Sequence, residues 1–537
     1  MILVRNLRLA PDENVAVLKP RAAKKLRTAE NEITALKLVK RSLDARHKDD
    51  IHYVCSVAVS LSGDEKRCIA RAKNKDVADY TPHEYIIPRV DAPRERPVIV
   101  GFGPAGMFAA LVLAYAGARP IVIERGRDAL RRKAAVEAFR AGGALDTECN
   151  VQFGEGGAGT FSDGKLNTGT HDRRMNWVLE QFYAHGANES VLYDAKPHIG
   201  TDVLIDIVQR IRADVIAYGG EVRFETRLDR LCISDGRLTG AVVTAPDGQY
   251  EIACSRLILA VGHSARDTFE ALFSQGIEMQ PKPFSMGVRI EHKQSCIDDA
   301  QYGENHTSTL PAADYSLNVH LPDGTSAYTF CMCPGGEVFA AASEQGGVVI
   351  NGMSYSRRDG ENANSALLVT LTPEDFPDKS TLGGMYWQRE IERAAFHCGG
   401  DNYLAPAQTV GDFLAHRASR APMGVQPSYR PGVVWCDLHE VLPKRITSVL
   451  ENALPQLGRR LSGFDAPEAV MTAPETRSSS PVRIVRDATL QSGVAGLYPC
   501  GEGAGYAGGI SSAAVDGMRC AEAVLRDIED GAGKSPV

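Results

Sequence analysis

The chain has 537 residues, too many for a single hydrophobic core, so we expect two or three domains. Apolar side chains make up 44% of the sequence and charged side chains 24%, which is typical of a soluble globular protein. The formal net charge of −7 is mild, and no apolar run approaches the roughly 20 residues that span a bilayer. We therefore expect neither a membrane anchor nor a DNA-binding surface.

The cysteines predict a reducing environment. Twelve of them are scattered along the chain without the spacing of a disulfide framework, and the N-terminus lacks the features of a signal peptide. We therefore expect a cytoplasmic protein. Cys331 and Cys333 form the only close pair, and the sequence around them lacks the second pair or histidine cluster of a metal site. We interpret them as ordinary buried thiols and predict no metal site.

Residues 1–92 are predicted to form a small α+β domain. The segments 2–9 and 52–61 alternate between apolar and polar residues as strands do, and residues 20–45 between them have a helical pattern. Basic residues outnumber acidic ones over residues 1–90, which fits an acidic protein or RNA partner, or a solvated surface of interleaved charges. We favour the solvated surface, because the strands lack the aromatic ladder on which RNA bases stack.

Residues 96–126 predict a strand, a tight glycine turn, a helix of small residues and a second strand. Gly101, Gly103 and Gly106 have the spacing of a dinucleotide-binding turn: the first permits the turn, the second lets backbone approach a pyrophosphate, and the third allows helix–strand packing. The helix N-terminus would present free N–H groups to the phosphates. Glu124 ends the second strand, 23 residues after Gly101, where an acid can accept hydrogen bonds from ribose hydroxyls. The unit predicts an adenine dinucleotide site.

The rest of the chain predicts a domain inserted within another. A glycine-rich stretch at 154–169 precedes a helical pattern at 201–220 and strand-like segments between 221 and 262. Residues 285–480 are richer in proline, asparagine and short apolar runs, which indicates a mixed, β-rich domain. Near the C-terminus, GEGAGYAGGISSAA lies between an apolar strand and a helical pattern and begins 400 residues after Gly101. Two glycine turns so far apart in one site imply an insertion between them.

Seven motifs cover most of the chain from about residue 96 to residue 530: GFGPAG, FGEGGAGTFSDGKLNT, AVGHSARDT, FCMCPGG, NGMSYSRRDGENANSAL, PETRSSSPVRI and GEGAGYAGGISSAAVDG. Together they resemble an uncharacterised FAD-dependent dehydrogenase family (NAD(FAD)-utilising dehydrogenase-like) of the glutathione-reductase-type flavoprotein superfamily. Glu502 departs from that pattern, since flavoproteins more often carry Asp there. The resemblance implies FAD as the bound cofactor, and Ala260-Val261-Gly262 is similar to the Ala-Thr-Gly turn of flavoproteins.

The resemblance implies an α/β fold, with a Rossmann-like FAD-binding domain, an inserted mixed, β-rich substrate domain, and a small N-terminal α+β domain of ferredoxin-like type. The expected boundaries are 1–92 for the N-terminal domain, 96–284 for the first part of the FAD-binding domain, 285–480 for the inserted substrate or cap domain, and 481–530 for the closing segment. The cofactor-binding residues that the resemblance implies come from several separate segments: Gly101, Gly103, Pro104, Ala105, Gly106, Glu124, Arg125, Gly157, Thr160, Ser162, Lys165, Arg227, Leu228, Gly262, Gly501, Glu502, Gly508, Gly509 and Ile510.

Three residues are candidates for catalysis. Lys165 would hold a phosphate or approach the flavin edge, and Arg477 would clamp a substrate carboxylate or pair with Glu475. Lys165, Arg477 and Glu475 therefore make up the predicted catalytic set. His198 and His263 could donate protons, and we interpret both as structural.

We predict an FAD-dependent oxidoreductase that exchanges hydride between flavin N5 and an unidentified small molecule. Because no second strand–glycine turn–helix unit occurs between 285 and 480, NAD(P)H would act as a transient electron donor, or the electrons would come from the substrate. The alternative is a non-catalytic or regulatory flavoprotein that binds a protein or RNA partner through residues 1–92.

Overall fold

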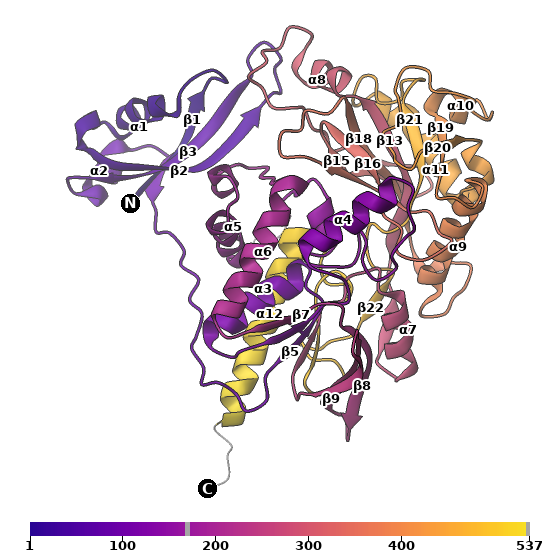
Figure 1. Cartoon of the computed structure of the whole chain (residues 1–537). Coiled ribbons are helices and arrows are strands. Elements are labelled where there is room, and N and C mark those ends of the chain that lie inside the picture. Colours follow the sequence, from indigo (N-terminus) through magenta and orange to yellow (C-terminus); the bar gives the residue numbers. More distant parts are fainter. Residues whose placement is uncertain (167–171, 533–537) are drawn as a thin grey trace.

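The protein has two large sheet-based parts and a smaller N-terminal unit (Figure 1). The computed structural model describes residues 1–166 and 172–532, so positions 167–169 of the predicted glycine-rich stretch lie outside the described residues. Among the helices that are described, none offers an apolar stretch long enough to cross a membrane.

The N-terminal unit is an antiparallel sheet of strand order β2-β3-β1-β4 with two helices. Its elements are β1 (Ile2–Leu9), α1 (Leu18–Leu26), β2 (Ile33–Asp44), β3 (His52–Leu61), α2 (Glu65–Ala72) and β4 (Val77–Asp79). The helix predicted over 20–45 is wrong beyond residue 26. Arg27 adopts a left-handed conformation with φ 55° that ends α1, and the following residues pair with β3 along the whole of β2. Long-range strand pairing has overridden the local helical pattern.

The second part is an α/β domain around a parallel sheet of order β23-β11-β5-β6-β7. Its strands are β5 (Val98–Val100), β6 (Ile121–Ile123), β7 (Glu221–Arg223), β11 (Leu257–Leu259) and β23 (Leu497–Pro499). Its helices are α3 (Pro104–Ala116), α4 (Ala129–Arg140), α5 (Arg174–Ala184), α6 (Thr201–Ala217), α7 (Arg266–Ser274) and α12 (Ile510–Ala532). A separate antiparallel sheet contains β8 (Arg227–Ser234), β9 (Arg237–Ala245) and β10 (Gly248–Ala253).

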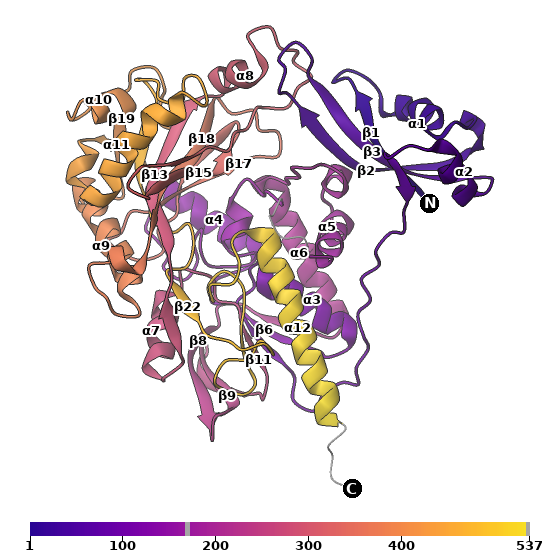
Figure 2. The same cartoon turned by 180° about the vertical axis from the view of Figure 1, so that it is seen from behind.

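The two ends of this α/β domain come from distant parts of the chain. Strand β23 adds to the edge of the sheet beside β11, and α12 lies along α3, as the view from behind shows (Figure 2). Helix α3 is itself buried on nearly every side, which explains its continuous run of small and apolar residues. The C-terminal segment is therefore an integral part of the domain that begins near residue 98.

The third part is built on a seven-stranded sheet of order β14-β15-β18-β13-β21-β19-β20. Its strands are β13 (Phe284–Lys293), β14 (Asn318–His320), β15 (Ser326–Cys333), β18 (Asn362–Leu371), β19 (Ala405–Thr409), β20 (Val433–Trp435) and β21 (Val470–Glu475). A hairpin of β16 (Gly336–Ala340) and β17 (Ile350–Ser354) accompanies it, with helices α8 (Gln294–Tyr302), α9 (Gly383–Cys398), α10 (Val410–Leu414) and α11 (Lys444–Gly458). The central strands β13 and β18 are buried on both faces. Strand β18 accordingly carries no charged residue, whereas β13 contains the buried Arg289 and Glu291, whose side chains are hydrogen-bonded within the fold.

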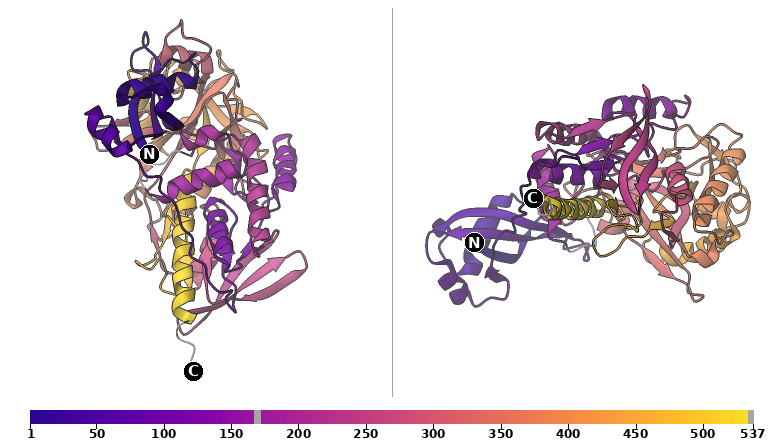
Figure 3. Two further views of the ribbon diagram at one scale, coloured as in Figure 1. Left: turned by 90° about the vertical axis from the view of Figure 1, so that its left-hand side faces the viewer. Right: turned by 90° about the horizontal axis from the view of Figure 1, so that it is seen from below.

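The chain enters and leaves this third part through one short antiparallel pair, β12 (Met279–Pro281) with β22 (Val482–Ile484). The N-terminal unit projects from the side of the body (Figure 3) and is connected to β5 by the extended segment 80–97. An ion pair between Arg41 and Asp194, with Nε and Oδ1 2.7 Å apart, joins the unit to the α/β domain. The tertiary structure therefore places the two large parts face to face, with the N-terminal unit at their side.

Candidate functional site

A cavity opens where the carboxyl ends of the parallel strands meet the third part of the molecule. Residues directly after β5, β6, β11 and β23 line it, which is where open α/β sheets bind their ligands. The opposite wall comes from the third part of the molecule: Thr329 and Cys331 lie on β15, Asn351 lies on the hairpin, and Tyr315 lies on the loop before β14. The cavity therefore lies between two units that are separate in the fold.

The first glycine turn forms one end of this cavity. Gly101 has φ +96°, and a β-carbon added there would lie 2.4 Å from the carbonyl oxygen of Ala260. A β-carbon on Gly106 would lie 1.9 Å from the carbonyl oxygen of Gly101, so this glycine serves helix packing and does not line the cavity. Gly103, Pro104 and Ala105 do line it, and no side chain caps α3 at Gly103. The uncapped N-terminus of α3 leaves backbone N–H groups available to an anion.

Glu124 lies at the end of β6 and ties three loops together. Its Oε2 accepts a hydrogen bond from the Phe102 N–H at 2.8 Å, and its Oε1 accepts from the N–H groups of Gly126 and Gly154, each at 2.9 Å. The carboxylate still lines the cavity, although only 5% of the residue is exposed. Glu124 therefore has a structural role, which the sequence did not predict, in addition to any contact with ribose.

Arg125 and the strand β8 continue the same wall. The Arg125 guanidinium forms ion pairs with Glu148 and Asp267, each at 2.9 Å, and lies over the Phe153 ring. Arg227 and Leu228, the first residues of β8, also line the cavity, as does Gly262 after β11. These positions lie together although they are far apart in sequence.

The glycine-rich segment after residue 154 packs against the first turn. A β-carbon on Gly157 would lie 2.8 Å from the Cα of Gly103, so the two backbones meet directly. Ser162 lines the cavity, and so does Lys165, whose Nζ donates to the carbonyl oxygen of Met332 in the third part. Thr160, in contrast, is 2% exposed and lies behind the wall, among residues of its own segment.

The C-terminal glycine segment closes the cavity from the other side. Glu502, Gly508, Gly509 and Ile510 line it, whereas Gly501 is buried behind the wall and its N–H donates to Asp516. Burial raises the pKa of Glu502 to about 7, and a hydrogen bond from the Gly509 backbone works in the opposite direction. This carboxyl group therefore takes up and releases a proton near neutral pH.

Of the two roles predicted for Arg477, the pairing with Glu475 is wrong. Glu475 forms two hydrogen bonds with Arg289, from Nε at 2.6 Å and from Nη2 at 3.0 Å. Arg477 instead donates two hydrogen bonds to Glu392, from Nε at 3.0 Å and from Nη2 at 2.8 Å, and Arg266 donates to the same carboxylate. Both Arg477 and Glu475 line the cavity, but their charges are already matched by buried partners. A substrate carboxylate would have to displace Glu392 to be clamped by Arg477.

The two histidines named from the sequence differ in position. His263 lines the cavity, and burial lowers its pKa to about 3, so the ring is neutral at neutral pH. His198 lies behind the wall with Nε2 3.2 Å from the carbonyl oxygen of Ser356, and burial lowers its pKa as well. Neither ring is positively charged at neutral pH, so neither is set to act as a proton donor.

Several lining residues were missed by sequence reasoning. Tyr315 carries no local signal, since it comes from a loop of ordinary pattern, whereas Asn351 is the first residue of the motif NGMSYSRRDGENANSAL. Arg358 lies in the same motif, for which the sequence predicted no role, and it pairs with the buried Asp163. The motif was the signal that could have identified it.

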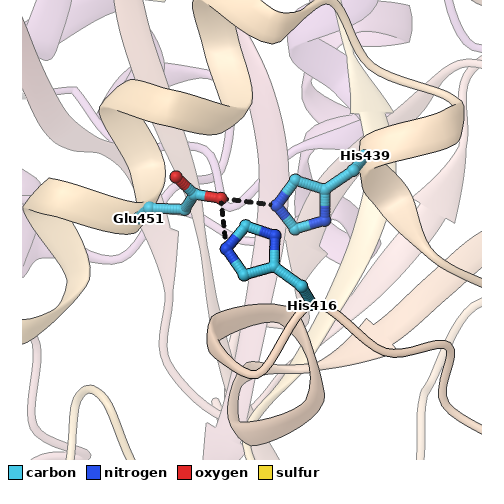
Figure 4. A group of neighbouring side chains, drawn as sticks. All are labelled: His416, His439 and Glu451. Atoms are coloured by element: carbon cyan, nitrogen blue, oxygen red, sulfur yellow. Dashed lines mark hydrogen bonds and ion pairs between the residues drawn. The ribbon is translucent and has the colours of Figure 1, made fainter.

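A second group of polar side chains lies outside the cavity, on the third part: His416, His439 and Glu451 (Figure 4). The Nε2 atoms of His416 and His439 lie 3.3 and 2.7 Å from Oε1 of Glu451. The two rings stack with centroids 4.6 Å apart, and Nδ1 of His439 lies 2.6 Å from Asp437. Stacked rings cannot both direct an in-plane lone pair at one ion at about 2.0–2.1 Å, so the geometry favours a hydrogen-bonded network over a metal centre.

Comparisons with known proteins add three findings. Residues 283–478 match the family described as FAD-dependent protein, C-terminal domain-like, and residues 1–60 match a domain of unknown function, DUF8436. An uncharacterised protein of Clostridium beijerinckii is 46% identical over 533 residues, covering 98% of this chain and 99% of its own. Among solved structures, the flavin-dependent brominase Bmp2 is 13% identical, with a TM-score of 0.37 over 81% of this chain and 79% of that one. The glycerol-3-phosphate dehydrogenase from Bacillus halodurans complexed with FAD is 11% identical, with a TM-score of 0.35 over 83% and 66% of the respective chains.

Proposed function

The chain belongs to the same family as the uncharacterised clostridial protein, which matches it almost from end to end, and from this premise we propose that it is an FAD-dependent oxidoreductase acting on a small molecule. The match of residues 283–478 to an FAD-dependent protein family supports FAD as the cofactor. Bound FAD would supply two-electron redox chemistry, while the protein supplies binding, orientation and electrostatics.

One observation carries the proposal: four segments separated in sequence line one cavity at the ends of the parallel strands. They are the glycine turn at 101–105, Glu124 with Arg125, the loop after β11, and residues 502–510. An adenine dinucleotide needs such an arrangement, because its phosphates, ribose and ring system extend across several strand ends.

The residues present fit this cofactor. A β-carbon on Gly103 would meet nothing of the protein closer than 3.6 Å, and one on Gly508 would meet nothing within 4 Å, so both backbones are open toward the cavity. The α3 N-terminus would bind the pyrophosphate through unpaired N–H groups. The Glu124 carboxylate already accepts three backbone hydrogen bonds, and its remaining lone pairs would accept a hydrogen bond from a ribose hydroxyl. Glu502 would meet the ribitol chain.

The substrate would lie between the α/β domain and the third part of the molecule. Tyr315, Asn351 and Arg358 face the cavity from that side, and His263 faces it from the loop after β11. We propose hydride exchange as the reaction class, with NAD(P)H as a transient donor or with electrons supplied by the substrate. Lys165 spans the two parts through its bond to the Met332 carbonyl and would position the segment that carries it.

A non-catalytic function is the second candidate, and a basic groove on the N-terminal unit favours it. The groove is lined mainly by cationic side chains: Arg8, Arg21, Lys24, Lys25, Arg27, Lys73 and Lys75. Such a surface would attract an acidic protein or RNA. Arg8, Arg21 and Lys25 already pair with carboxylates of the same unit, which weakens the attraction.

The purified protein tests the proposal directly. It should be yellow, with an absorption band near about 450 nm, and the released chromophore should be FAD. Rapid mixing with NADH or NADPH, or with candidate substrates, should bleach that band if the protein is an oxidoreductase. A colourless protein that takes up no added FAD would refute the cofactor, and a flavin that no donor reduces would favour the non-catalytic function.

A further inference from the structure

The cysteine pair at the end of β15 lies on the wall of the cavity. Cys331 lines the cavity, while Cys333 behind it has no exposed surface. The pairing of β15 with β18 shifts register between Phe330 and Cys333, and Cys331 has φ 43°, in the left-handed region. A residue with a side chain adopts this conformation only where its surroundings require it, and such bulges redirect side chains beside functional sites. The bulge therefore directs Cys331 into the cavity.

The surroundings of the pair distinguish its two sulfurs. The Cys333 thiol donates to the Cys331 carbonyl oxygen, with Sγ and O 3.2 Å apart. Nη1 of the fully buried Arg289 lies 3.2 Å from that carbonyl and 3.8 Å from Cys333 Sγ. Lys165 approaches from the other side, bonded to the carbonyl between the two cysteines. Arg289 and Lys165 therefore both contact the backbone of the pair, and Arg289 also lies beside the Cys333 sulfur.

This arrangement favours a thiolate at Cys331. The neighbouring Cys333 thiol lowers the pKa of the Cys331 thiol against the effect of burial, and Arg289 and Lys165 lower it further, while the pKa of Cys333 is raised. Burial raises the pKa of Cys254 to about 12. Among the other charged groups near the pair, Asp163 pairs with Arg358, and Glu475 pairs with Arg289. Glu502 also lines the cavity, and burial raises its pKa. Because Cys331 lines the cavity and Cys333 lies behind it, Cys331 is the nucleophile of the pair and Cys333 is the thiol that attacks next.

We propose that Cys331 and Cys333 form a redox-active dithiol that reduces disulfides entering the cavity. The Cys331 thiolate attacks one sulfur of R–S–S–R, which breaks the substrate disulfide, forms a mixed disulfide on Cys331 and releases RS⁻. The Cys333 thiol gives its proton to the released thiolate and attacks Sγ of Cys331, which breaks the mixed disulfide and releases the second RS⁻. The dithiol loses two electrons to become a Cys331–Cys333 disulfide, and the substrate gains them as two thiols. A dithiol reductant such as dithiothreitol restores the starting state.

This inference goes beyond the proposed oxidoreductase, because each step uses only side chains of this chain and the disulfide. The sequence favoured ordinary buried thiols at both positions. That interpretation does not account for a thiol directed into the cavity at a left-handed bulge beside two cations. The absorption spectrum of the flavin reports on the cofactor separately, so failure of one proposal leaves the other testable.

The experiment uses the full-length protein as purified, reduced with dithiothreitol, freed of the reductant and treated with 5,5′-dithiobis(2-nitrobenzoate). Peptide mass mapping of the wild type should find Cys331 and Cys333 joined to each other. Cys333→Ser should instead trap thionitrobenzoate on Cys331, and Cys331→Ser should yield neither product at this site. Cys296→Ser, which removes an exposed thiol on α8, is the matched control and should behave as wild type at the pair.

A second measurement needs no variant. The rate of alkylation of Cys331 by iodoacetamide, mapped by mass, should reach half its maximum at a lower pH than that of an ordinary thiol, which does so near about pH 8.5. Wild-type protein without the internal disulfide, or Cys333→Ser protein without the adduct on Cys331, would overturn the proposal. An alkylation midpoint like that of an ordinary thiol would overturn it as well.

Discussion

Gly508 provides the sharpest test of where the cofactor lies. It lines the cavity, it is exposed, and a β-carbon added there would meet no protein atom within 4 Å. Gly493 is also exposed, also has open space around an added β-carbon, and is not among the cavity-lining residues. Gly508→Val and Gly493→Val therefore make the same chemical change, once inside the cavity and once outside it.

The expected effects follow from this difference. Each substitution reduces the freedom of the unfolded chain by a similar amount, about 0.4–1 kcal/mol, so the two variants should unfold at similar temperatures. Only the valine at 508 occupies space that a ligand lying on the backbone would need. Crowding of this kind costs about 1–3 kcal/mol, which corresponds to FAD binding roughly 5- to 150-fold weaker.

Titration of cofactor-free protein with FAD, followed by quenching of FAD fluorescence, measures the two dissociation constants. Thermal unfolding without FAD shows whether either fold has been damaged. The reasoning is refuted if Gly508→Val binds FAD as tightly as wild type, or if Gly493→Val weakens binding equally. Either result would mean that the C-terminal glycines do not face the cofactor.

Three further predictions concern buried charge. Glu124→Ala leaves three backbone N–H groups without their acceptor, at a cost of about 1–3 kcal/mol each. Urea should therefore unfold the cofactor-free variant at a clearly lower concentration than wild type. An unchanged unfolding midpoint would contradict the structural role of Glu124. Arg289→Met leaves the Glu475 carboxylate buried without a partner and should lower the free energy of unfolding by about 3–5 kcal/mol. Adding Glu475→Met should restore most of this loss. A double variant that loses as much stability as the single variant would argue against the ion pair. Glu502 has a folded pKa of about 7 against an ordinary 4.5, so the native state binds more protons between these values and stability is lost as pH rises from 4.5 through 7. Glu502→Gln should remove this part of the pH dependence of the unfolding temperature in cofactor-free protein, and a slope identical to wild type would show that another group causes it.

Local sequence rules were sufficient for the first glycine turn. The spacing of Gly101, Gly103 and Gly106 reflects contacts within a few residues, and in the structure the added β-carbon at Gly106 would strike Gly101 itself. The helix over 201–217 and the strands at 2–9 and 52–61 were likewise predicted from periodicity alone. The helix forms most of its hydrogen bonds between near neighbours in the chain, and the strands bury one face through a short repeating pattern of apolar residues.

The same rules failed where the deciding partner is distant. Residues 33–44 form a strand because β3 offers a ladder of backbone partners, which no local propensity reports. A pair with the neighbouring Arg477 was one of the two alternatives predicted from the sequence, whereas in the structure Glu475 pairs with Arg289, 186 residues earlier. A buried charge is stabilised by whichever opposite charge the fold brings within reach, and proximity in sequence has little influence on that choice.

The composition and motifs of the chain were thus enough to indicate a dinucleotide-type α/β domain, its glycine turns and the acid after its second strand, because each depends on contacts between near neighbours. The packing of the two large sheets against each other decided which residues line the cavity and which charges are already neutralised. It also decided that Cys331, and not Cys333, faces inward. Side-chain direction at a strand end depends on register, and the register of β15 is set by pairing with β18. That information is non-local, so the site could be outlined from the sequence and its chemistry assigned only from the tertiary structure.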